Sequence, residues 1–323
     1  MSDPRVLVAG EALVDLFPTS GGPVTEARTL QREAGGAPAN VAVALARLDH
    51  PPLLWARLGD DPFGDHLQSV LTEEGIREDL LEWDNDRKTA HTLVGQDEEG
   101  DQSFTFFADG TATFAMEPGT VDDETLAEVE WAHAGGVSLF TEPARSATFD
   151  LLERANEYGC TVSFDPNTRP DRWPDGTVLI ETLERAISLS DVVKTDQEDL
   201  SVLVDATDED ALAEAVLDMG PHTVLLTRGS EGAMARASAD APWGPAEAAF
   251  EGYDVDVVET TGAGDAFVAG TITALGLQQA GLAEALRYAS AVGGLATTVT
   301  GAMAGLPTAA DVETLVAGGG HGE

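Results

Sequence analysis

Short apolar runs alternate with amphipathic stretches along the whole chain, and this alternation limits the fold more than any other feature. Six runs that end in glycine or turn residues predict short buried strands. They are RVLVAG (5–10), PLLWARLG (52–59), VEWAHAGG (129–136), CTVSFDP (160–166), SDVVKT (190–195) and HTVLLTRG (222–229). Four stretches with helical spacing lie at 39–48, 62–75, 146–159 and 208–220. The pattern predicts an α/β fold in which helices cover both faces of a mostly parallel sheet.

Two regions interrupt this alternation. Residues 11–33 contain no convincing helix, and residues 88–114 resemble two strands joined by an acidic, glycine-containing turn. These segments are expected to pair into a small sheet that projects from the main domain. At 323 residues the chain is long enough for one large domain with such an appendage. We assign residues 1–316 to this domain and expect the glycine-rich tail, 317–323, to be disordered.

The chain is strongly acidic. It has 58 Asp and Glu residues against 17 Lys and Arg, a formal net charge of -41, and its only lysines are Lys88 and Lys194. Such a surface repels nucleic acids and anionic membranes, so neither is an expected partner. It serves either solubility alone or adaptation to molar salt; because the charges spread along the whole length, we favour adaptation. A single cysteine, Cys160, and the lack of a signal-like or membrane-spanning run predict a cytoplasmic protein.

Several common catalytic motifs are missing from the sequence. A phosphate-binding loop of the G-x-x-x-x-G-K-[ST] type needs a Gly-Lys pair, which neither lysine supplies. The glycines at 262–270 do not follow the dinucleotide pattern G-x-G-x-x-G, and they lie far from the first strand. There is no H-E-x-x-H zinc motif and no G-x-S-x-G elbow. We therefore expect neither a P-loop nor nicotinamide, zinc or acyl-serine chemistry.

The segment VETTGAGDAF (258–267) is the strongest candidate for a reactive site. VDVV (255–258) is strand-like and the residues after the glycines are helix-like, so Gly262, Ala263 and Gly264 would stand at a helix entrance. Their N–H groups at the positive end of the helix dipole could hold a phosphoryl group. Asp265 would then place a carboxylate beside it, as deprotonation of an attacking hydroxyl requires. The alternative is a tight strand-to-helix crossing with Asp265 as a helix cap.

A second glycine-rich entrance lies in GGAPANVAVALARL (35–48). Gly35 and Gly36 precede a helix with Asn40 near its first turn, an arrangement that suits a hydroxyl-rich ligand. Loop glycines with an ordinary N-cap are the alternative. Together the two segments resemble the signatures of the ribokinase-like, or PfkB-type, carbohydrate kinases, in the right order and at the right separation. GEALVDLFP (10–18), FDPNTRPDRW (164–173) and LLTRGSEGA (225–233) are similar to further segments of the fructokinase-like branch.

The resemblance implies a ribokinase-like three-layer α/β/α fold, with 11–33 and 88–114 as a β-sheet lid over the sugar. It implies Asp265 as the general base and 262–264 as the anion hole. The implied sugar-binding residues are Asp15, Gly35, Gly36, Asn40 and Arg169. The implied nucleotide-binding residues are Lys194, Thr227, Gly229, Gly232 and Asn167.

Three departures from the family pattern are visible. Glu259 stands where the family usually has Asp before the threonines, a change that should be tolerated. Asp196 and Asp199 replace a common Asn-x-x-Glu that organises magnesium, and they are either its carboxylate partners or an acidic surface turn. In FTFFADG (104–110), Ala108 falls where relatives that phosphorylate 2-keto-3-deoxygluconate tend to carry an arginine. A carboxylate substrate would lose one fixed cation there.

The resemblance thus implies an ATP-dependent sugar kinase with magnesium as cofactor and a small-molecule sugar as substrate, fructose first. The alternative within this class is 2-keto-3-deoxygluconate, since Arg169 could hold a carboxylate by itself. A noncatalytic nucleotide or sugar sensor on the same fold is the alternative of another class, although a sensor has no need of Asp265. A requirement for K⁺ and a homodimer formed through the lid stay open.

Overall fold

A large twisted sheet forms the centre of the molecule. The computed structural model describes residues 4–19, 21–96, 102–173, 175–204, 206 and 208–319. Within them the larger sheet has the order β13-β12-β11-β10-β9-β8-β1-β4-β5. Its strands are β1 (Val6–Ala9), β4 (Leu53–Gly59), β5 (Leu81–Asp84), β8 (Trp131–Gly135), β9 (Thr161–Asp165), β10 (Val192–Thr195), β11 (Thr223–Thr227), β12 (Ala233–Ala237) and β13 (Ala246–Phe250). Neighbours from β11 to β5 are parallel, and β12 and β13 add an antiparallel edge. The six expected strands are confirmed.

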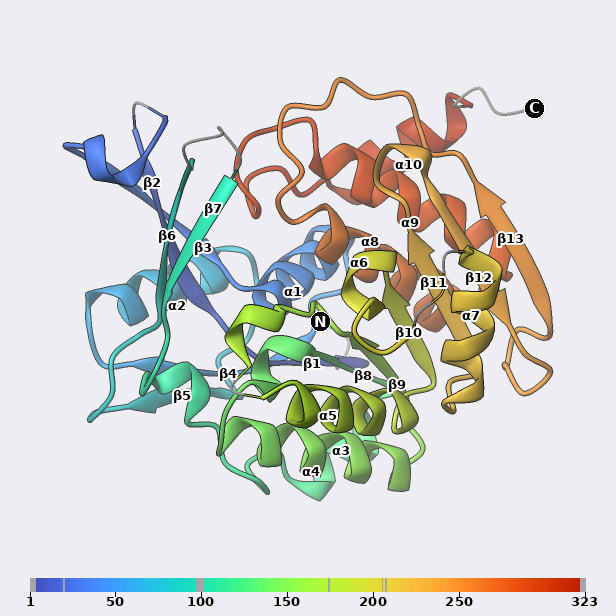
Figure 1. Ribbon diagram of the computed structural model, residues 1–323, viewed down its shortest axis with the longest axis horizontal. Coiled ribbons are helices and arrows are strands. Elements are labelled where there is room, and N and C mark those ends of the chain that lie inside the picture. The colour runs from blue at the N-terminus through green and yellow to red at the C-terminus, as the bar shows by residue number, and fades with distance from the viewer. Residues whose placement is uncertain are drawn as a thin grey trace.

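Helices cover both faces of this sheet, so the expected three-layer α/β/α class is confirmed (Figure 1). One layer holds α1 (Ala37–Arg47), α2 (Pro62–Glu73), α8 (Ala263–Thr271), α9 (Leu282–Ala296) and α10 (Ala309–Ala317). The other holds α3 (Asp123–Glu128), α4 (Ala144–Glu157), α5 (Gly176–Ser188), α6 (Gln197–Leu200) and α7 (Glu209–Asp218). Because successive strand residues point to opposite faces, Val6 and Val8 pack with the first layer and Leu7 and Ala9 with the second.

Short helical turns join some of these elements. Five are 3-10 helices: Val24–Glu26, Ala112–Phe114, Gly136–Leu139, Pro170–Arg172 and Gly229–Glu231. A π-helical turn, Ile272–Leu277, extends α8. Among the described residues, no helix combines the length and the apolar character that a membrane span needs.

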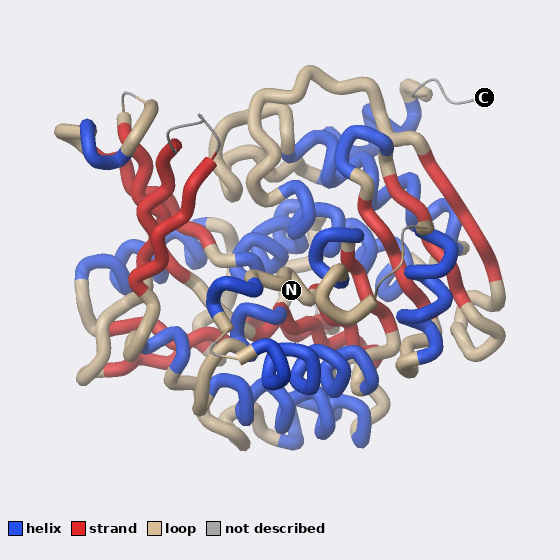
Figure 2. The backbone as a smooth tube through the Cα atoms, viewed as in Figure 1, coloured by secondary structure: helices blue, strands red, loops and turns tan. Residues whose placement is uncertain are grey.

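A second, four-stranded sheet projects from one side as the expected lid (Figure 2). Its strands, in the order β3-β2-β6-β7, are β2 (Leu13–Pro18), β3 (Leu30–Gly35), β6 (His91–Gln96) and β7 (Gln102–Phe107). They come from the two segments that interrupt the strand and helix alternation. Most of the acidic turn predicted between β6 and β7, residues 97–101, lies outside the described residues.

The prediction of a strand at 255–258 is wrong. β13 ends at Phe250, and the chain then continues as a loop in which Val257 and Val258 are 62% and 61% exposed. Valines favour strands only where a neighbouring strand and a buried face are available, and this loop has neither. At the C-terminus, α10 extends to Ala317, and most of the predicted tail, 320–323, lies outside the described residues.

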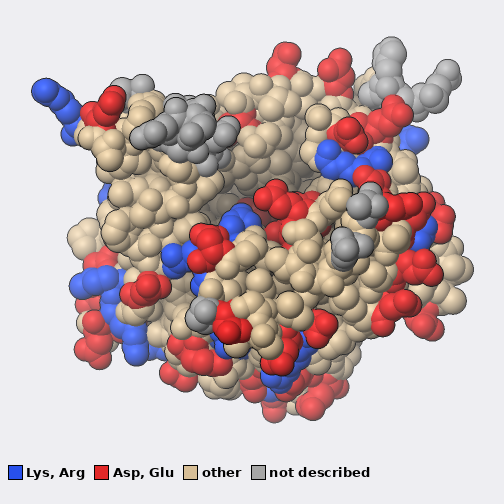
Figure 3. Space-filling view, in the orientation of Figure 1, with Lys and Arg blue, Asp and Glu red and all other residues tan. Residues whose placement is uncertain are grey.

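Acidic side chains are scattered over the face shown in Figure 3, with far fewer basic ones between them. Screening should relieve this distributed repulsion, since the Debye length falls from ~10 Å at 0.1 M salt to ~3 Å at 1 M. We therefore predict that the melting temperature, followed by circular dichroism, increases as the NaCl concentration is raised from about 0.1 to about 3 M, the range over which screening becomes nearly complete. A neutral osmolyte controls for general effects on burial. A melting temperature that stays flat over this range would refute salt adaptation.

Candidate active site

The ends of several parallel strands and the starts of two helices meet at one edge of the large sheet. Glu11 follows β1, Asp165 ends β9 and Lys194 lies near the end of β10, while α1 and α8 begin at the same edge. In open α/β sheets, ligands bind outside the carboxyl ends of the strands. The space-filling view shows this face hollowed between the lid and the α8 side (Figure 3).

The start of α8 has the backbone geometry of an anion-binding site. Gly262 is its N-cap, with a φ of 81° in the left-handed region that glycine adopts without strain. No side chain caps this helix, whereas Asp61 and Asp175 cap α2 and α5. Ala263 N–H donates to Thr260 O at 3.1 Å, so this amide of the predicted anion hole already has a partner. An incoming anion would therefore rely more on the two glycine amides and the helix dipole.

Asp265 lies in the first turn of α8 and is held by a residue from the other helix. Asn40 Nδ2 donates to Asp265 Oδ2 at 2.8 Å. Burial raises the pKa of Asp265 to about 7, the Asn40 hydrogen bond opposes this rise, and the Asp165 carboxylate adds to it. A carboxylate with a pKa near neutrality and a fixed orientation is suited to accept a proton.

A buried cation lies beside the turn at 262–264, the predicted anion-binding turn. Lys194 Nζ is 3.0 Å from Asp165 Oδ2, and both side chains are buried. A Cβ atom on Gly264 would lie only 3.1 Å from the same Nζ, so the ammonium group lies against the start of α8. Burial alone would lower the pKa of Lys194, but the carboxylates of Asp165 and Asp199 raise it above its ordinary value. Lys194 is therefore a fixed positive charge where an anion would arrive.

A cavity of about 590 Å³ opens next to Lys194 and the start of α8. It is lined by all but one of the residues predicted for nucleotide binding, and by two from the anion-binding turn. These are Lys194, Thr227, Gly229, Gly232, Ala263 and Gly264. Sequence reasoning missed its apolar part, formed by Tyr253, Val255, Val257 and Phe267, since two of these lie in the loop that was expected to be a strand. The size and mixed lining suit a nucleotide.

Asn167 is the predicted nucleotide-binding residue that the cavity lining does not include. It lies in the turn after β9 with a φ of 40°, and its N–H donates to Asp165 Oδ1 at 3.2 Å. Asp165 thus holds both this turn and Lys194. The sequence placed Asp165 and Asn167 in one pattern but did not identify the ion pair.

Of the two aspartates predicted for metal binding, Asp196 is the N-cap of the short helix α6 and Asp199 lies within it. Asp196 Oδ1 accepts Asp199 N–H at 2.8 Å, and Asp199 Oδ1 accepts Thr168 N–H at 2.6 Å. Burial, together with the neighbouring carboxylates of Asp165 and Asp196, raises the pKa of Asp199 to about 7. In the described part of the chain, no group of three or more His, Cys, Asp or Glu side chains forms a metal site. Magnesium prefers oxygen ligands such as carboxylates, phosphates and water, so the chemistry of the pair is compatible with this ion, and the metal role of Asp196 and Asp199 stays a prediction.

The predicted sugar-side residues gather where the lid joins the main domain. Asp15 on β2 pairs with Glu33 on β3, and a Cβ atom on Gly35 would lie 2.3 Å from Asp15 Oδ2. Burial raises the pKa of Asp15 to about 7, and the Glu33 and Glu259 carboxylates add to this rise. The opening between the lid and α8 is thus strongly acidic.

Arg169 brings a positive charge to the same opening. Its Nη1 atom donates to Thr168 O at 3.0 Å and lies 4.0 Å from Asp199 Oδ1. Its positive charge lowers the pKa values of Asp265 and Glu11, although burial affects both pKa values more. The guanidinium group therefore lies near these two carboxyl groups. The half-exposed side chain is free to meet a ligand.

Glu11 was missed by sequence reasoning. It is 3% exposed and lies between the end of β1 and the start of α1. Its signal in the sequence was a carboxylate in the otherwise apolar GEALV (10–14), directly after the predicted first strand. Charged side chains are almost never fully buried unless they are paired or have a function.

Comparison with known proteins agrees with this geometry. Residues 3–309 match the model of the family described as pfkB family carbohydrate kinase. The chain is 37% identical to a fructokinase of Vibrio alginolyticus over 94% of this chain and 96% of that protein. It is similar to the structure of fructokinase with bound ATP from Xylella fastidiosa, at 31% identity and a TM-score of 0.86, over 97% and 98% of the two chains. It also resembles a double mutant of fructokinase from Vibrio cholerae O395 bound to fructose, ADP and potassium, at 32% identity, a TM-score of 0.81, and 97% and 98% coverage.

A buried histidine below the site gives a stability prediction. Burial lowers the pKa of His133 to about 4, and its Nδ1 lies 2.9 Å from Ser163 Oγ. Since the unfolded chain binds the proton more readily, this contribution to stability is present above pH ~6.5 and is lost as the pH falls toward 4. Wild type should lose about 3 kcal/mol more unfolding free energy over this range than His133→Gln. Equal losses in urea titrations would contradict the prediction.

Proposed function

Because the chain belongs to the pfkB family of carbohydrate kinases, we propose that it transfers the γ-phosphoryl group of ATP to a hydroxyl group of fructose. One observation carries the proposal. Asp265, with a pKa raised to about 7, is held by Asn40 at the start of a helix that no side chain caps. A sensor would need the anion-binding turn but not the oriented base.

In the proposed reaction, Asp265 takes the proton of the attacking sugar hydroxyl. The hydroxyl oxygen forms a bond to the γ-phosphorus, and the bond to the β,γ-bridging oxygen breaks, so ADP leaves with that electron pair. The amides of Gly262 and Gly264, more than that of Ala263, and the Lys194 ammonium stabilise the negative charge on the transferred group. Catalysis is then mostly positioning and charge stabilisation, with the lid excluding water.

The other predicted residues take supporting roles in this proposal. Asp15, Gly35, Gly36, Asn40 and Arg169 bind the sugar below the lid. Thr227, Gly229 and Gly232, which line the cavity, hold the nucleotide, and Asn167 orders the turn beside its phosphates. The relative from Xylella fastidiosa was solved with ATP.

We propose magnesium as the metal that accompanies ATP, with Asp196 and Asp199 holding it through one carboxylate oxygen each or through water. Bound magnesium supplies charge neutralisation of the phosphates. The Vibrio cholerae relative contains potassium, and a potassium requirement here remains a prediction. A domain spanning residues 1–316, a cytoplasmic location and a homodimer through the lid likewise stay proposals.

The surroundings of Ala108 support a neutral sugar over 2-keto-3-deoxygluconate. Ala108 is 4% exposed and packs in the apolar cluster that includes Leu13, Phe114 and Met116, so no cation stands at this position. Arg172 approaches the lid instead, with its guanidinium carbon 5.4 Å from the Phe106 ring centre. An Ala108→Arg substitution would have to bury its charge in this cluster.

The substrate assignment predicts that fructose gives the highest kcat/KM in a coupled ADP-release assay with a sugar panel. A preference for 2-keto-3-deoxygluconate would refute fructose as the substrate, and no turnover of any sugar would favour the sensor.

The Asp265→Asn variant tests the assignment of the base. It keeps the shape of the base but cannot accept the proton, so it should lower kcat by orders of magnitude while ATP and fructose still bind. A variant that retains a tenth of wild-type kcat would refute the base assignment.

The pKa of Asp265 predicts the pH dependence of the reaction. Its carboxylate must be deprotonated to act, so kcat/KM for the sugar should fall as the pH drops below about 7 and level off above it. Asn40→Ala removes the hydrogen bond that lowers this pKa and should move the rising limb to higher pH. A limb near the ordinary aspartate pKa, or one that Asn40→Ala does not move, would contradict the assignment.

A further inference from the structure

Glu11 is a buried carboxyl group that the proposed mechanism leaves unexplained. Its Oε1 atom accepts Ala37 N–H at 3.1 Å. Its Oε2 atom is fully buried and has no hydrogen-bond partner among the described residues. Burying a carboxyl group with one unsatisfied oxygen is costly, so it is retained where the site gains something from it.

Glu11 contacts the start of α1 through both its main chain and its side chain. Gly36, the N-cap, has a φ of 104°, and a Cβ atom there would lie 2.5 Å from Glu11 O, so only glycine lets the two backbones approach this closely. The next residue, Ala37, donates to the Glu11 carboxyl group. Together the two contacts fix the first turn of α1.

That turn carries the residue that orients the base. Asn40 N–H donates to Gly36 O at 2.8 Å, and Asn40 Nδ2 donates to Asp265 Oδ2. The Asn40 side chain is 5% exposed and therefore has little freedom of its own. Any shift of the first turn would move the Asn40 amide and, with it, the Asp265 carboxylate.

We propose that Glu11 is a positioning residue for phosphoryl transfer: through its hydrogen bond with Ala37 it fixes the first turn of α1, and through Asn40 it fixes Asp265. The inference rests on the proposed kinase function. Enzymatic rates fall sharply when a reacting group is displaced by even about 1 Å, so a loosened turn should reduce kcat.

The charge state of Glu11 agrees with this role. Burial raises the pKa of Glu11 to about 8, and the backbone N–H groups of Glu11 itself and of Ala37 oppose the rise. The facing charges, Asp265 on α8 and Arg169 after β9, act in opposite directions. The neutral acid therefore dominates at pH 7. It adds no negative charge beside the base and the arriving phosphoryl group, and the amide of glutamine has nearly the same shape and charge.

Two substitutions separate the hydrogen bond from the acid. Glu11→Gln keeps the length and the acceptor for Ala37, and its kcat with fructose should stay within about threefold of wild type, near the scatter expected for a conservative change. Glu11→Asp keeps the acid but withdraws it by one methylene, and its kcat should fall at least ~10-fold with an unchanged KM for ATP. The reverse order, or Glu11→Asp within threefold of wild type, would overturn the proposal.

A double-mutant cycle tests whether Glu11 acts through Asn40. Once Asn40→Ala has removed the link, adding Glu11→Asp should cost little further kcat, because coupled positions are not additive. Fully additive losses would overturn the route through α1. If wild type phosphorylates no sugar, the kinase function itself fails; if wild type is active but the variants keep wild-type kcat, only the positioning role fails.

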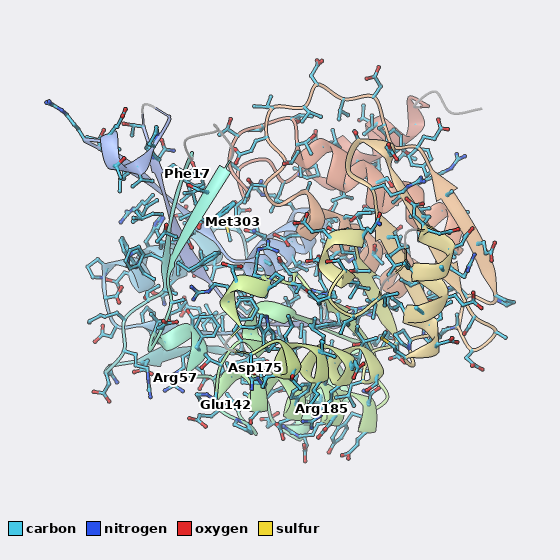
Figure 4. All side chains as sticks on the ribbon, viewed as in Figure 1. Phe17, Arg57, Glu142, Asp175, Arg185 and Met303 are labelled. Atoms are coloured by element: carbon cyan, nitrogen blue, oxygen red, sulfur yellow. The ribbon has the colours of Figure 1, made fainter. Side chains whose placement is uncertain are left out.

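Asp175→Ala is the matched control for a purely structural effect. Asp175 caps α5 by accepting Thr177 N–H at 2.7 Å, and Figure 4 shows it beside α5, in the helical layer that does not contain α1 and α8. Loss of this cap should lower the melting temperature by a few degrees without changing kcat. A Glu11→Asp variant that likewise loses only melting temperature would show that Glu11 stabilises the fold alone.

Discussion

The hydrogen bond between Asn40 and Asp265 joins residues that are 225 positions apart in the chain. The orientation of the Asp265 carboxylate in the candidate site depends on it. It can form because α1 and α8 begin at the same edge of the sheet and pack in the same helical layer. Each helix starts at a glycine with a positive φ, which turns the chain sharply into the helix. The parallel sheet thus brings together the residues proposed to bind the sugar and those proposed to bind the phosphoryl group.

The candidate site holds a buried positive charge, whereas the molecule as a whole is strongly negative. The surface is dominated by carboxylates, yet the anion-binding turn faces Lys194, one of two lysines in the chain. Its pairing with Asp165 keeps this cation charged while it is buried. Four neighbouring carboxyl groups, those of Glu11, Asp15, Asp199 and Asp265, have pKa values raised to about 7 or 8 by burial. The site can therefore hold several acids and still receive an anionic nucleotide near neutral pH.

The sequence predicted the fold well in segments where the spacing of apolar residues is typical of a strand or a helix. Six of the parallel strands were predicted because short apolar runs and glycine stops mark them, whereas β5 was not predicted. The lid segments were predicted because they interrupt the alternation of strands and helices. The loop at 255–258 was misjudged, because β-branched residues look alike in a strand and in the wall of a cavity. Whether such residues pair with a neighbouring strand depends on the tertiary structure, which a short window does not contain.

The candidate site was only partly predictable for the same reason. Glycines and Asp265 stand next to each other in the chain, so their spacing carried a signal. The contacts of Glu11 with Ala37 and of Lys194 with Asp165 span 26 and 29 positions, and no local pattern encodes them. The buried carboxyl group of Glu11 became informative only once the fold showed what surrounds it.

A crystal structure with magnesium, a nonhydrolysable ATP analogue and fructose would test the central claim most directly. The account predicts that a fructose hydroxyl lies about 3 Å from the Asp265 carboxylate, which is hydrogen-bond reach. It also predicts that the terminal phosphate rests on the start of α8 with Lys194 beside it. A sugar bound with its hydroxyl groups turned away from Asp265, or a terminal phosphate far from residues 262–264, would contradict the account.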